Sequence, residues 1–232
     1  MAIKTRKASD LTKKKLNAII MGESGTGKTY LARTIPSSMK VLFINISPYE
    51  DGTISISDLD IDVVDITSVE EMNNLMEDLK TDTKYDVIYL DGLTALSKLS
   101  MEYASNANPG VAGKFKKYED HSRFMEVVLL TLKAIDKYVF STCLAAYEEE
   151  AGAYKFALDG KAFGKILGAR VDAILPIKVN KEGKRALLTQ NDGTYPAKVR
   201  LPGDKQIAKL IAADLGKLLE VIGYVKTKEE KK

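Results

Sequence analysis

The chain has 232 residues, of which 45% are hydrophobic and 29% charged, and its formal net charge at pH 7 is +3. That length suits one α/β domain with a large core but is short for two, and no apolar run reaches the roughly 18 residues of a membrane span. A single cysteine and a single histidine exclude a disulfide framework and argue against a zinc site or a histidine-based catalytic cluster. We therefore expect a protein of the reducing cytoplasm with no secretion signal and no membrane partner.

Apolar strands and amphipathic helices alternate through the first part of the chain. Strands are expected at 16–21, 41–46, 61–66, 87–90 and 138–145, and helices at 28–35, 69–79 and 123–137. Such alternation predicts an α/β fold whose mainly parallel sheet is covered by helices on both faces.

The pattern changes after residue 170. Short strands are expected at 171–179, 186–189 and 195–199, separated by hairpin-type turns at 180–183 and 191–193, so the sheet should end in an antiparallel meander. A last amphipathic helix is expected from its apolar residues Ile207, Leu210, Ile211, Leu215, Leu218 and Ile222, ending near Gly223. The domain would span 16–223, between a basic N-terminal arm over 1–15 and a charged, disordered tail over 224–232.

A glycine-rich segment follows the first expected strand. It reads Gly22, Glu23, Ser24, Gly25, Thr26, Gly27, Lys28, Thr29. This matches the P-loop pattern G-x-x-x-x-G-K-[ST], whose backbone N–H groups curl around phosphates at a helix N-terminus. Lys28 would neutralise the β and γ phosphates, and the Thr29 hydroxyl would ligate magnesium. The segment therefore predicts binding of ATP with Mg²⁺.

A carboxylate at the end of a buried strand is a second, independent signal. The apolar run 87–90 ends at Asp91, which would lie beside the P-loop at the C-terminal edge of the sheet. There it would hold magnesium through water. The alternative is that Asp91 caps the following helix.

Several short motifs together resemble a family of RecA-like P-loop ATPases found mostly in phage genomes. They are the P-loop, Asp91, Leu158-Asp159-Gly160-Lys161, Arg170-Val171-Asp172 and Ala197-Lys198-Val199-Arg200. Some relatives of that family anneal or recombine single-stranded DNA. The resemblance extends over about 16–203, and within it only the P-loop is highly specific.

The resemblance implies further catalytic residues. RecA-like enzymes usually carry a water-orienting glutamate just after the second strand, and Glu50 is the candidate, although it comes a few residues late and a solvated loop glutamate is the alternative. Lys198 and Arg200 look like the lysine-x-arginine pair that ring-forming motors insert into a neighbour's ATP site, which implies a homo-oligomer with shared sites; the alternative is a basic strand end facing water. The chain departs from the pattern at 146–148, Ala-Tyr-Glu, where such families often place a glutamine or histidine that senses the γ-phosphate.

The resemblance also places DNA against two long loops, about 97–122 and 148–170. The expected DNA-binding residues are Lys114, Lys116, Lys117, Tyr154, Lys155, Phe156, Lys161, Phe163 and Lys165. Aromatic rings stack on bases of any sequence while ammonium groups follow phosphates, so binding to single strands should be salt-sensitive and sequence-tolerant. Against this, acidic residues flank both loops, and Phe156 or Phe163 would equally anchor a flap on the core.

Three other nucleotide-dependent functions are alternatives to an ATPase acting on DNA. A GTPase would read guanine with Asn-Lys-x-Asp, but the segment Asn180-Lys181-Glu182-Gly183 has glycine where the carboxylate is needed, so ATP is preferred. A P-loop small-molecule kinase stays open as the main enzymatic alternative, because such kinases also pair a P-loop with a magnesium-binding aspartate; its lid would be rich in arginine, and the 148–168 loop contains none. An ATP-switched assembly or packaging protein without DNA contact stays open. The preferred interpretation is a Mg²⁺-dependent ATPase that acts on single-stranded DNA in annealing or recombination.

Overall fold

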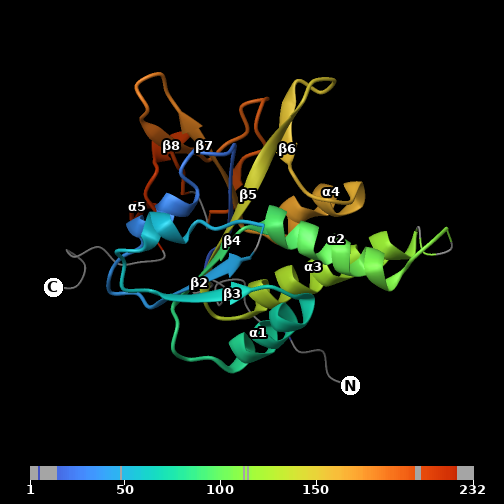
Figure 1. The fold of residues 1–232 in the computed structure, drawn as a ribbon. Coiled ribbons are helices and arrows are strands. Elements are labelled where there is room, and N and C mark those ends of the chain that lie inside the picture. Colours follow the sequence, from blue (N-terminus) through green and yellow to red (C-terminus); the bar gives the residue numbers. More distant parts are fainter. Residues whose placement is uncertain are drawn as a thin grey trace.

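The computed structural model describes residues 5, 15–47, 49–111, 113, 115–201 and 205–223. Within these residues the strands form one ten-stranded sheet (Figure 1). The strands are β1 (Asn17–Gly22), β2 (Val41–Ile46), β3 (Asp62–Ile66), β4 (Val87–Asp91), β5 (Tyr138–Glu148), β6 (Ala153–Phe156), β7 (Ala173–Val179), β8 (Arg185–Leu188), β9 (Lys198–Val199) and β10 (Leu210–Ala212).

The sheet is parallel in its centre and antiparallel at one side, which confirms the predicted fold class. Its order is β10-β8-β7-β1-β5-β4-β2-β3, and the pairs from β7 across to β3 are parallel. Strands β8 and β10 continue the sheet in antiparallel fashion beyond β7, β9 also pairs with β7, and β6 folds back on β5. Because β5 lies between β1 and β4, the C-terminal ends of these three strands meet at one edge.

Helices cover both faces of the sheet. On one face lie α1 (Val69–Thr81), α2 (Leu93–Ala107), α3 (Lys116–Ala134) and α4 (Lys161–Arg170), which contribute to one hydrophobic core. On the other face lie α5 (Leu215–Ile222) and the 3₁₀-helices η2 (Thr29–Thr34) and η3 (Thr53–Ile56), which contribute to a second core. Strand residues alternate between the cores, since a strand points successive side chains to opposite faces. In β4, Ile88 packs in the first core and Tyr89 in the second.

Five predicted segments differ in the structure, one of them the strand expected at 195–199, which is only the two-residue β9. Only a short 3₁₀-helix, η2, follows the glycine-rich loop, in place of a helix over 28–35. The expected loop 97–122 is largely α2 and α3, and the expected loop 148–170 is largely β6 and α4. The last helix is α5 alone, because Leu210–Ala212 pairs as β10 with β8. The predicted terminal arm and tail lie outside the described residues, apart from Thr5 and Lys15.

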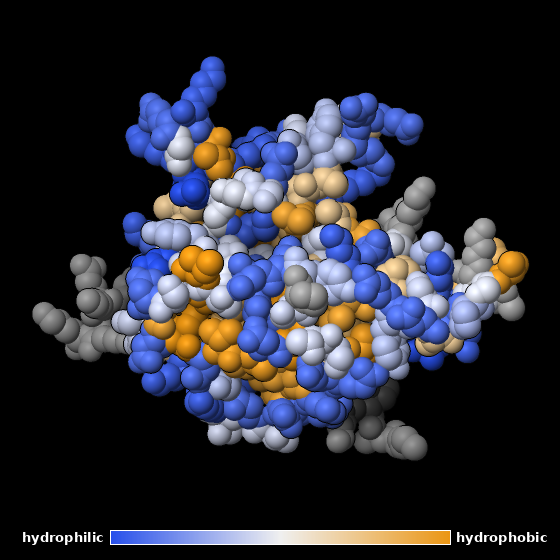
Figure 2. Space-filling view, in the orientation of Figure 1, coloured by the Kyte–Doolittle hydropathy of each residue, from blue (hydrophilic) through white to orange (hydrophobic). Residues whose placement is uncertain are grey.

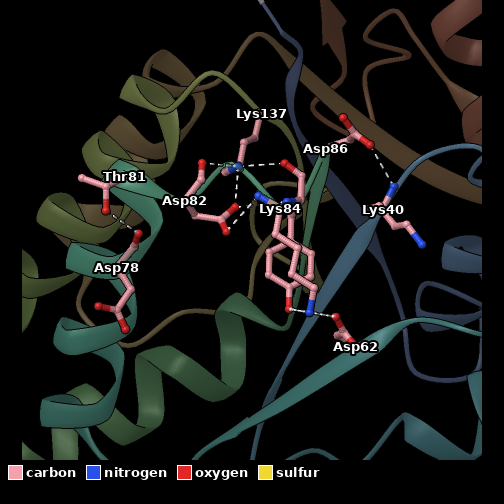
Figure 3. Close-up of polar contacts among 9 residues, drawn as sticks. Lys40, Asp62, Asp78, Thr81, Asp82, Lys84, Asp86 and Lys137 are labelled. Carbon is pink, nitrogen blue, oxygen red and sulfur yellow. Dashed lines mark hydrogen bonds and ion pairs between the residues drawn. The ribbon is translucent and has the colours of Figure 1, made fainter.

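A buried lysine fixes the edge of the sheet where β4 and β5 begin, opposite the glycine-rich loop. Lys137 is 6% exposed, and its Nζ donates to the backbone oxygens of Asp82 at 3.0 Å and Tyr85 at 2.7 Å (Figure 3). It also lies 2.7 Å from the Asp82 carboxylate. Burial alone would raise the pKa of Asp82, but the hydrogen bonds from Lys137 and the backbone lower it. The α1–β4 connection is thereby tied to the start of β5.

Apolar side chains reach the surface between β3 and α1 (Figure 2). A hollow of about 460 Å³ there is lined by residues that include Val63, Val64, Leu75 and Tyr85. It lies beside the Lys137 network, away from the glycine-rich loop, and none of its lining residues belongs to that loop.

Candidate active site

The loop from Gly22 to Thr29 joins the end of β1 to the start of η2. Gly25 has φ +78° and Gly27 has φ +94°, a region that L side chains rarely adopt, so the glycines are what allow the chain to curl here. The curl is closed by hydrogen bonds from the backbone N–H of Thr26 to the Glu23 oxygen and from that of Leu31 to the Gly27 oxygen. The loop therefore has the strand, turn and helix setting that a phosphate-binding loop requires.

Lys28 lies over this loop. Its Nζ donates to the backbone oxygens of Gly22 at 3.1 Å and Glu23 at 3.0 Å. Burial lowers the pKa of Lys28, while the negative charges of Glu50 and Asp91 oppose the shift. The Lys28 backbone oxygen also accepts a hydrogen bond from the Tyr89 hydroxyl of β4. The ammonium group is thus held at the mouth of the loop by groups of its own chain.

Asp91 is the centre of a small network of hydroxyl groups. Its side chain is buried, and it accepts hydrogen bonds from Thr29 Oγ1 at 2.7 Å and from Thr142 Oγ1 of β5 at 2.5 Å. The Asp91–Gly92 peptide bond is cis, and Gly92 rather than Asp91 is the N-cap residue of α2. The carboxylate therefore faces Thr29 at the edge of the sheet instead of capping the helix.

Glu50 reaches the same place from the segment that follows β2. A Cβ atom added at Gly92 would lie 2.7 Å from Glu50 Oε2 and 2.6 Å from Thr142 Oγ1, so the glycine provides room for both side chains. Burial raises the pKa of Glu50, the Asp91 charge raises it further, and Lys28 and Lys98 oppose the shift. This environment is not that of a solvated loop residue.

The oxygen atoms at this edge fit a hard divalent cation. Thr29 and Asp91 present a hydroxyl and a carboxylate in direct contact, which is the type of ligand that Mg²⁺ binds. Among the residues that the structure describes, no group of three or more His, Cys, Asp or Glu could hold a metal. A cation here would be shared between these two side chains, water and the phosphates of a nucleotide, as is usual for Mg²⁺.

Two contacts of the site were missed by sequence reasoning. Thr142 lies within a buried strand directly after Ser141, so its hydroxyl gave no distinct signal in the sequence. Tyr89 is fully buried, stacks on Phe43 with ring centroids 5.4 Å apart, and supports the loop through its hydroxyl. Strand β5 also continues to Glu148 instead of ending at Ala145, so the expected sensor position at 146–148 belongs to the hairpin with β6.

Lys198 and Arg200 lie at the opposite edge of the sheet, where β1 begins. Lys198 Nζ donates to the backbone oxygens of Gly168 and Val171 at the end of α4, and Arg200 forms an ion pair with Asp172. Lys198 therefore binds the C-terminus of α4, where cations are favourable, and Arg200 also donates to the backbone oxygen of Ala169 at 3.4 Å. Their action in a neighbouring subunit's site stays a prediction.

The residues predicted to bind DNA have different surroundings. Phe163 is 1% exposed and Phe156 packs against the core, so the stacking role predicted for Phe163 is not compatible with its burial. Tyr154 stacks on Tyr195 with centroids 4.0 Å apart, and Lys155 forms an ion pair with Glu148.

The remaining predicted DNA residues lie near the α2–α3 connection or on α4. Lys116 is exposed, and Lys117 Nζ lies over the Tyr118 ring, 5.3 Å from its centroid. Lys114 and the side chains of Lys161 and Lys165 lie outside the described part of the structure.

Comparison with known proteins gives the family of this chain. No curated protein matches it. A family model described as an AAA domain matches residues 14–201, which include the glycine-rich loop, Glu50, Asp91 and Thr142. No helix among the described residues is both long and apolar enough to cross a membrane. The chain therefore belongs to the AAA-domain family of P-loop ATPases.

Proposed function

We propose that this protein hydrolyses ATP in a Mg²⁺-dependent reaction at the edge formed by β1, β4 and the segment after β2. The observation that carries the proposal is the meeting of four side chains from separate parts of the chain: Lys28, Thr29, Glu50 and Asp91. A cation, a hydroxyl and two carboxylates beside a glycine-rich loop are the groups that phosphoanhydride hydrolysis requires.

Each group has a distinct part in the reaction. The loop N–H groups and the Lys28 ammonium bind the phosphates and neutralise charge that develops on the γ-phosphoryl oxygens. Thr29 and Asp91 would hold Mg²⁺, which would supply charge neutralisation for the phosphates. Glu50 orients the attacking water and accepts its proton, a role suited to a carboxylate whose pKa lies above the ordinary value.

The test is to measure ATP binding and phosphate release with the wild type, Lys28→Ala and Glu50→Gln. Glu77→Gln is the matched control, because Glu77 is an exposed glutamate on α1 that pairs with Lys80. We expect Lys28→Ala to weaken ATP binding, and Glu50→Gln to keep binding while losing about 100-fold or more of turnover. Glu77→Gln should match the wild type.

The outcomes separate the alternatives. ATP binding with no phosphate release by the wild type would refute the hydrolase and favour an ATP-switched assembly protein. Transfer to a small-molecule acceptor, with no release of phosphate in its absence, would favour a kinase. Normal turnover by Glu50→Gln would assign water orientation to another residue.

We also propose single-stranded DNA as the partner, in strand annealing or recombination of the phage type. The supporting observation is the end of the α2–α3 pair, which projects from the body of the molecule (Figure 1). There Phe115 is 83% and Tyr118 is 46% exposed, next to Lys116 and Lys117. Exposed rings beside ammonium groups suit base stacking and phosphate contact.

Anisotropy of labelled single strands of different sequences, measured from low to high salt, tests this partner. We expect binding that is tolerant of sequence and weakens with salt, and a loss of affinity in Phe115→Ala combined with Lys116→Glu. Lys80→Glu on α1 is the control. ATP turnover indifferent to DNA, with no binding at low salt, would refute the partner but not the ATPase.

A further inference from the structure

The turn between β7 and β8 brings a cation to the glycine-rich loop. Arg185 is the first residue of β8 and pairs with Val179 of β7. The turn is closed by Asn180, whose side-chain oxygen accepts hydrogen bonds from the N–H groups of Glu182 at 3.0 Å and Lys184 at 2.8 Å. The hairpin extends on the side of the sheet where the glycine-rich loop lies, with a hydrophilic surface (Figures 1 and 2). This tight turn fixes the position of Arg185 at the start of β8.

Arg185 contacts the loop directly. Its Nε donates to the backbone oxygen of Thr26 at 2.8 Å. A Cβ atom added at Gly27 would lie 2.8 Å from Arg185 Nε and 3.3 Å from its Cζ, so the guanidinium occupies space that a side chain at this position would need. Gly27 therefore provides both the backbone turn and the space for this arginine.

The fold does not otherwise use the Arg185 charge. Arg185 is exposed, and among the described residues no carboxylate lies within salt-bridge distance of it. Its neighbour Lys184 differs, because Lys184 Nζ lies 3.0 Å from Glu182 Oε2. Only Nε of the guanidinium has a recorded hydrogen bond in this part of the structure, so both Nη groups are available to an anion.

We propose that Arg185 binds the phosphates of the nucleotide in cis, as a second cation beside Lys28. This inference rests on the proposed function, since it needs a nucleotide on the loop. The planar guanidinium matches phosphate oxygens, and a charge-assisted hydrogen bond to phosphate is among the stronger ones available to a protein. Because Arg185 is exposed, its charge stays hydrated until the nucleotide binds, so the free protein carries little desolvation cost.

The structural alternative is that Arg185 only braces the loop through the Thr26 hydrogen bond. Arg185→Gln separates the two roles, because glutamine keeps an N–H donor but has no charge. Arg185→Lys keeps the charge and loses the planar fork. Lys184→Ala removes a neighbouring exposed cation and is the matched control.

The experiment measures the dissociation constants of MgATP and of inorganic tripolyphosphate, by competition against a fluorescent ATP analogue, for the wild type and these variants. We expect Arg185→Ala and Arg185→Gln to weaken both ligands by about tenfold or more, Arg185→Lys to weaken them less, and Lys184→Ala to match the wild type.

Four results would overturn the proposal. Wild-type affinity in Arg185→Gln together with weak binding in Arg185→Ala would leave only the bracing role. A loss of ATP affinity with unchanged tripolyphosphate affinity would place the arginine against the nucleoside instead. A wild type that binds neither ligand would refute the nucleotide site itself, whereas wild-type binding unchanged in every Arg185 variant would refute only the role of Arg185.

Discussion

Thr142→Val removes the one hydroxyl that links β5 to Asp91 while keeping the shape of the side chain. The Thr142 hydroxyl donates to Asp91 Oδ1 at 2.5 Å, and Asp91 is only 3% exposed, so water cannot simply replace it. A hydrogen bond to a charged group contributes about 1.5–3 kcal/mol. We expect the free energy of unfolding to fall by about 2 kcal/mol, which for a domain of this size lowers the Tm by roughly 4–8 °C.

The same substitution should weaken the use of magnesium. Thr142 holds one oxygen of Asp91 while the other oxygen accepts from Thr29, so the carboxylate has a fixed orientation. Removing a group that orients a metal ligand typically lowers metal affinity by about 10- to 100-fold. We therefore expect the Mg²⁺ concentration for half-maximal ATP hydrolysis to rise by about tenfold. The assay is phosphate release against Mg²⁺ at saturating ATP, alongside thermal unfolding.

Thr142→Ser is the control, because it keeps the hydroxyl and removes only a buried methyl group. Its Mg²⁺ dependence should equal that of the wild type even if its Tm is lower. If Thr142→Val is destabilised but shows wild-type Mg²⁺ dependence, Thr142 is a structural partner of Asp91 and the orienting role is refuted. If neither property changes, the hydrogen bond itself contributes nothing.

Four further predictions follow from the site and its supports. Gly27→Ala should abolish ATP binding in a competition assay while the chain stays folded, because its φ is +94° and the added Cβ meets Arg185; normal binding would contradict this. Tyr89→Phe should lower the free energy of unfolding by about 1 kcal/mol and weaken ATP binding, measured by urea titration and competition, since Lys28 loses its backbone hydrogen bond; unchanged affinity would limit Tyr89 to packing. Turnover should rise with pH as the Glu50 carboxylate forms, with an apparent pKa above the ordinary 4.5. It should fall again at high pH as Lys28 loses its proton, with an apparent pKa below the ordinary 10.5. The rise on the acid side should be missing from the residual activity of Glu50→Gln. Burial lowers the pKa of His121 below 6.5, so protons bind the unfolded chain more readily, and the Tm should fall as the pH drops below about 6.5, an effect that His121→Gln should reduce.

The phosphate-binding part of the site could be predicted because its signal is local. The spacing of glycines before Lys28 and Thr29, and the aspartate that ends an apolar strand, are each contained in fewer than ten residues of sequence. Glu50 was a weaker candidate, since its position depends on how the segment after β2 folds back toward Gly92. When a long connection brings a side chain to a site, no short sequence pattern indicates it.

Contacts that depend on strand order were not predictable in this way. Strand β5 lies between β1 and β4 although β2 and β3 come earlier in the chain, and this order is what places Thr142 against Asp91. Arg185 reaches the loop from 159 residues away. Both side chains looked ordinary in sequence, one in a buried strand and the other at the start of a meander.

The errors in the first segment expected to be a loop and in the last expected helix have different causes. Leu93, Leu96 and Leu99 recur at helical spacing and are buried in α2, which begins before the expected loop 97–122 and continues into it. Periodicity therefore supported a helix at the start of the segment in which the family resemblance implied a DNA-binding loop. Near the C-terminus, the apolar residues Leu210 and Ile211 fit a helical period, but the exposed edge of β8 offered backbone partners and the segment pairs there as β10. Local patterning was informative in the first case and was overridden by tertiary pairing in the second.

The arrangement of the two hairpins gives the site its connection to the rest of the molecule. Strand β5 carries Thr142 at the site and continues directly into the hairpin with β6, while β8 carries Arg185 at the start of the antiparallel part. A nucleotide that binds Lys28 and Arg185 would therefore hold the β7–β8 turn against the glycine-rich loop. A cation that changes the Asp91–Thr142 contact would change the position of β5. Both strands extend beyond the phosphate site. Nucleotide binding would therefore change the surface hairpins through the same residues that hold the nucleotide.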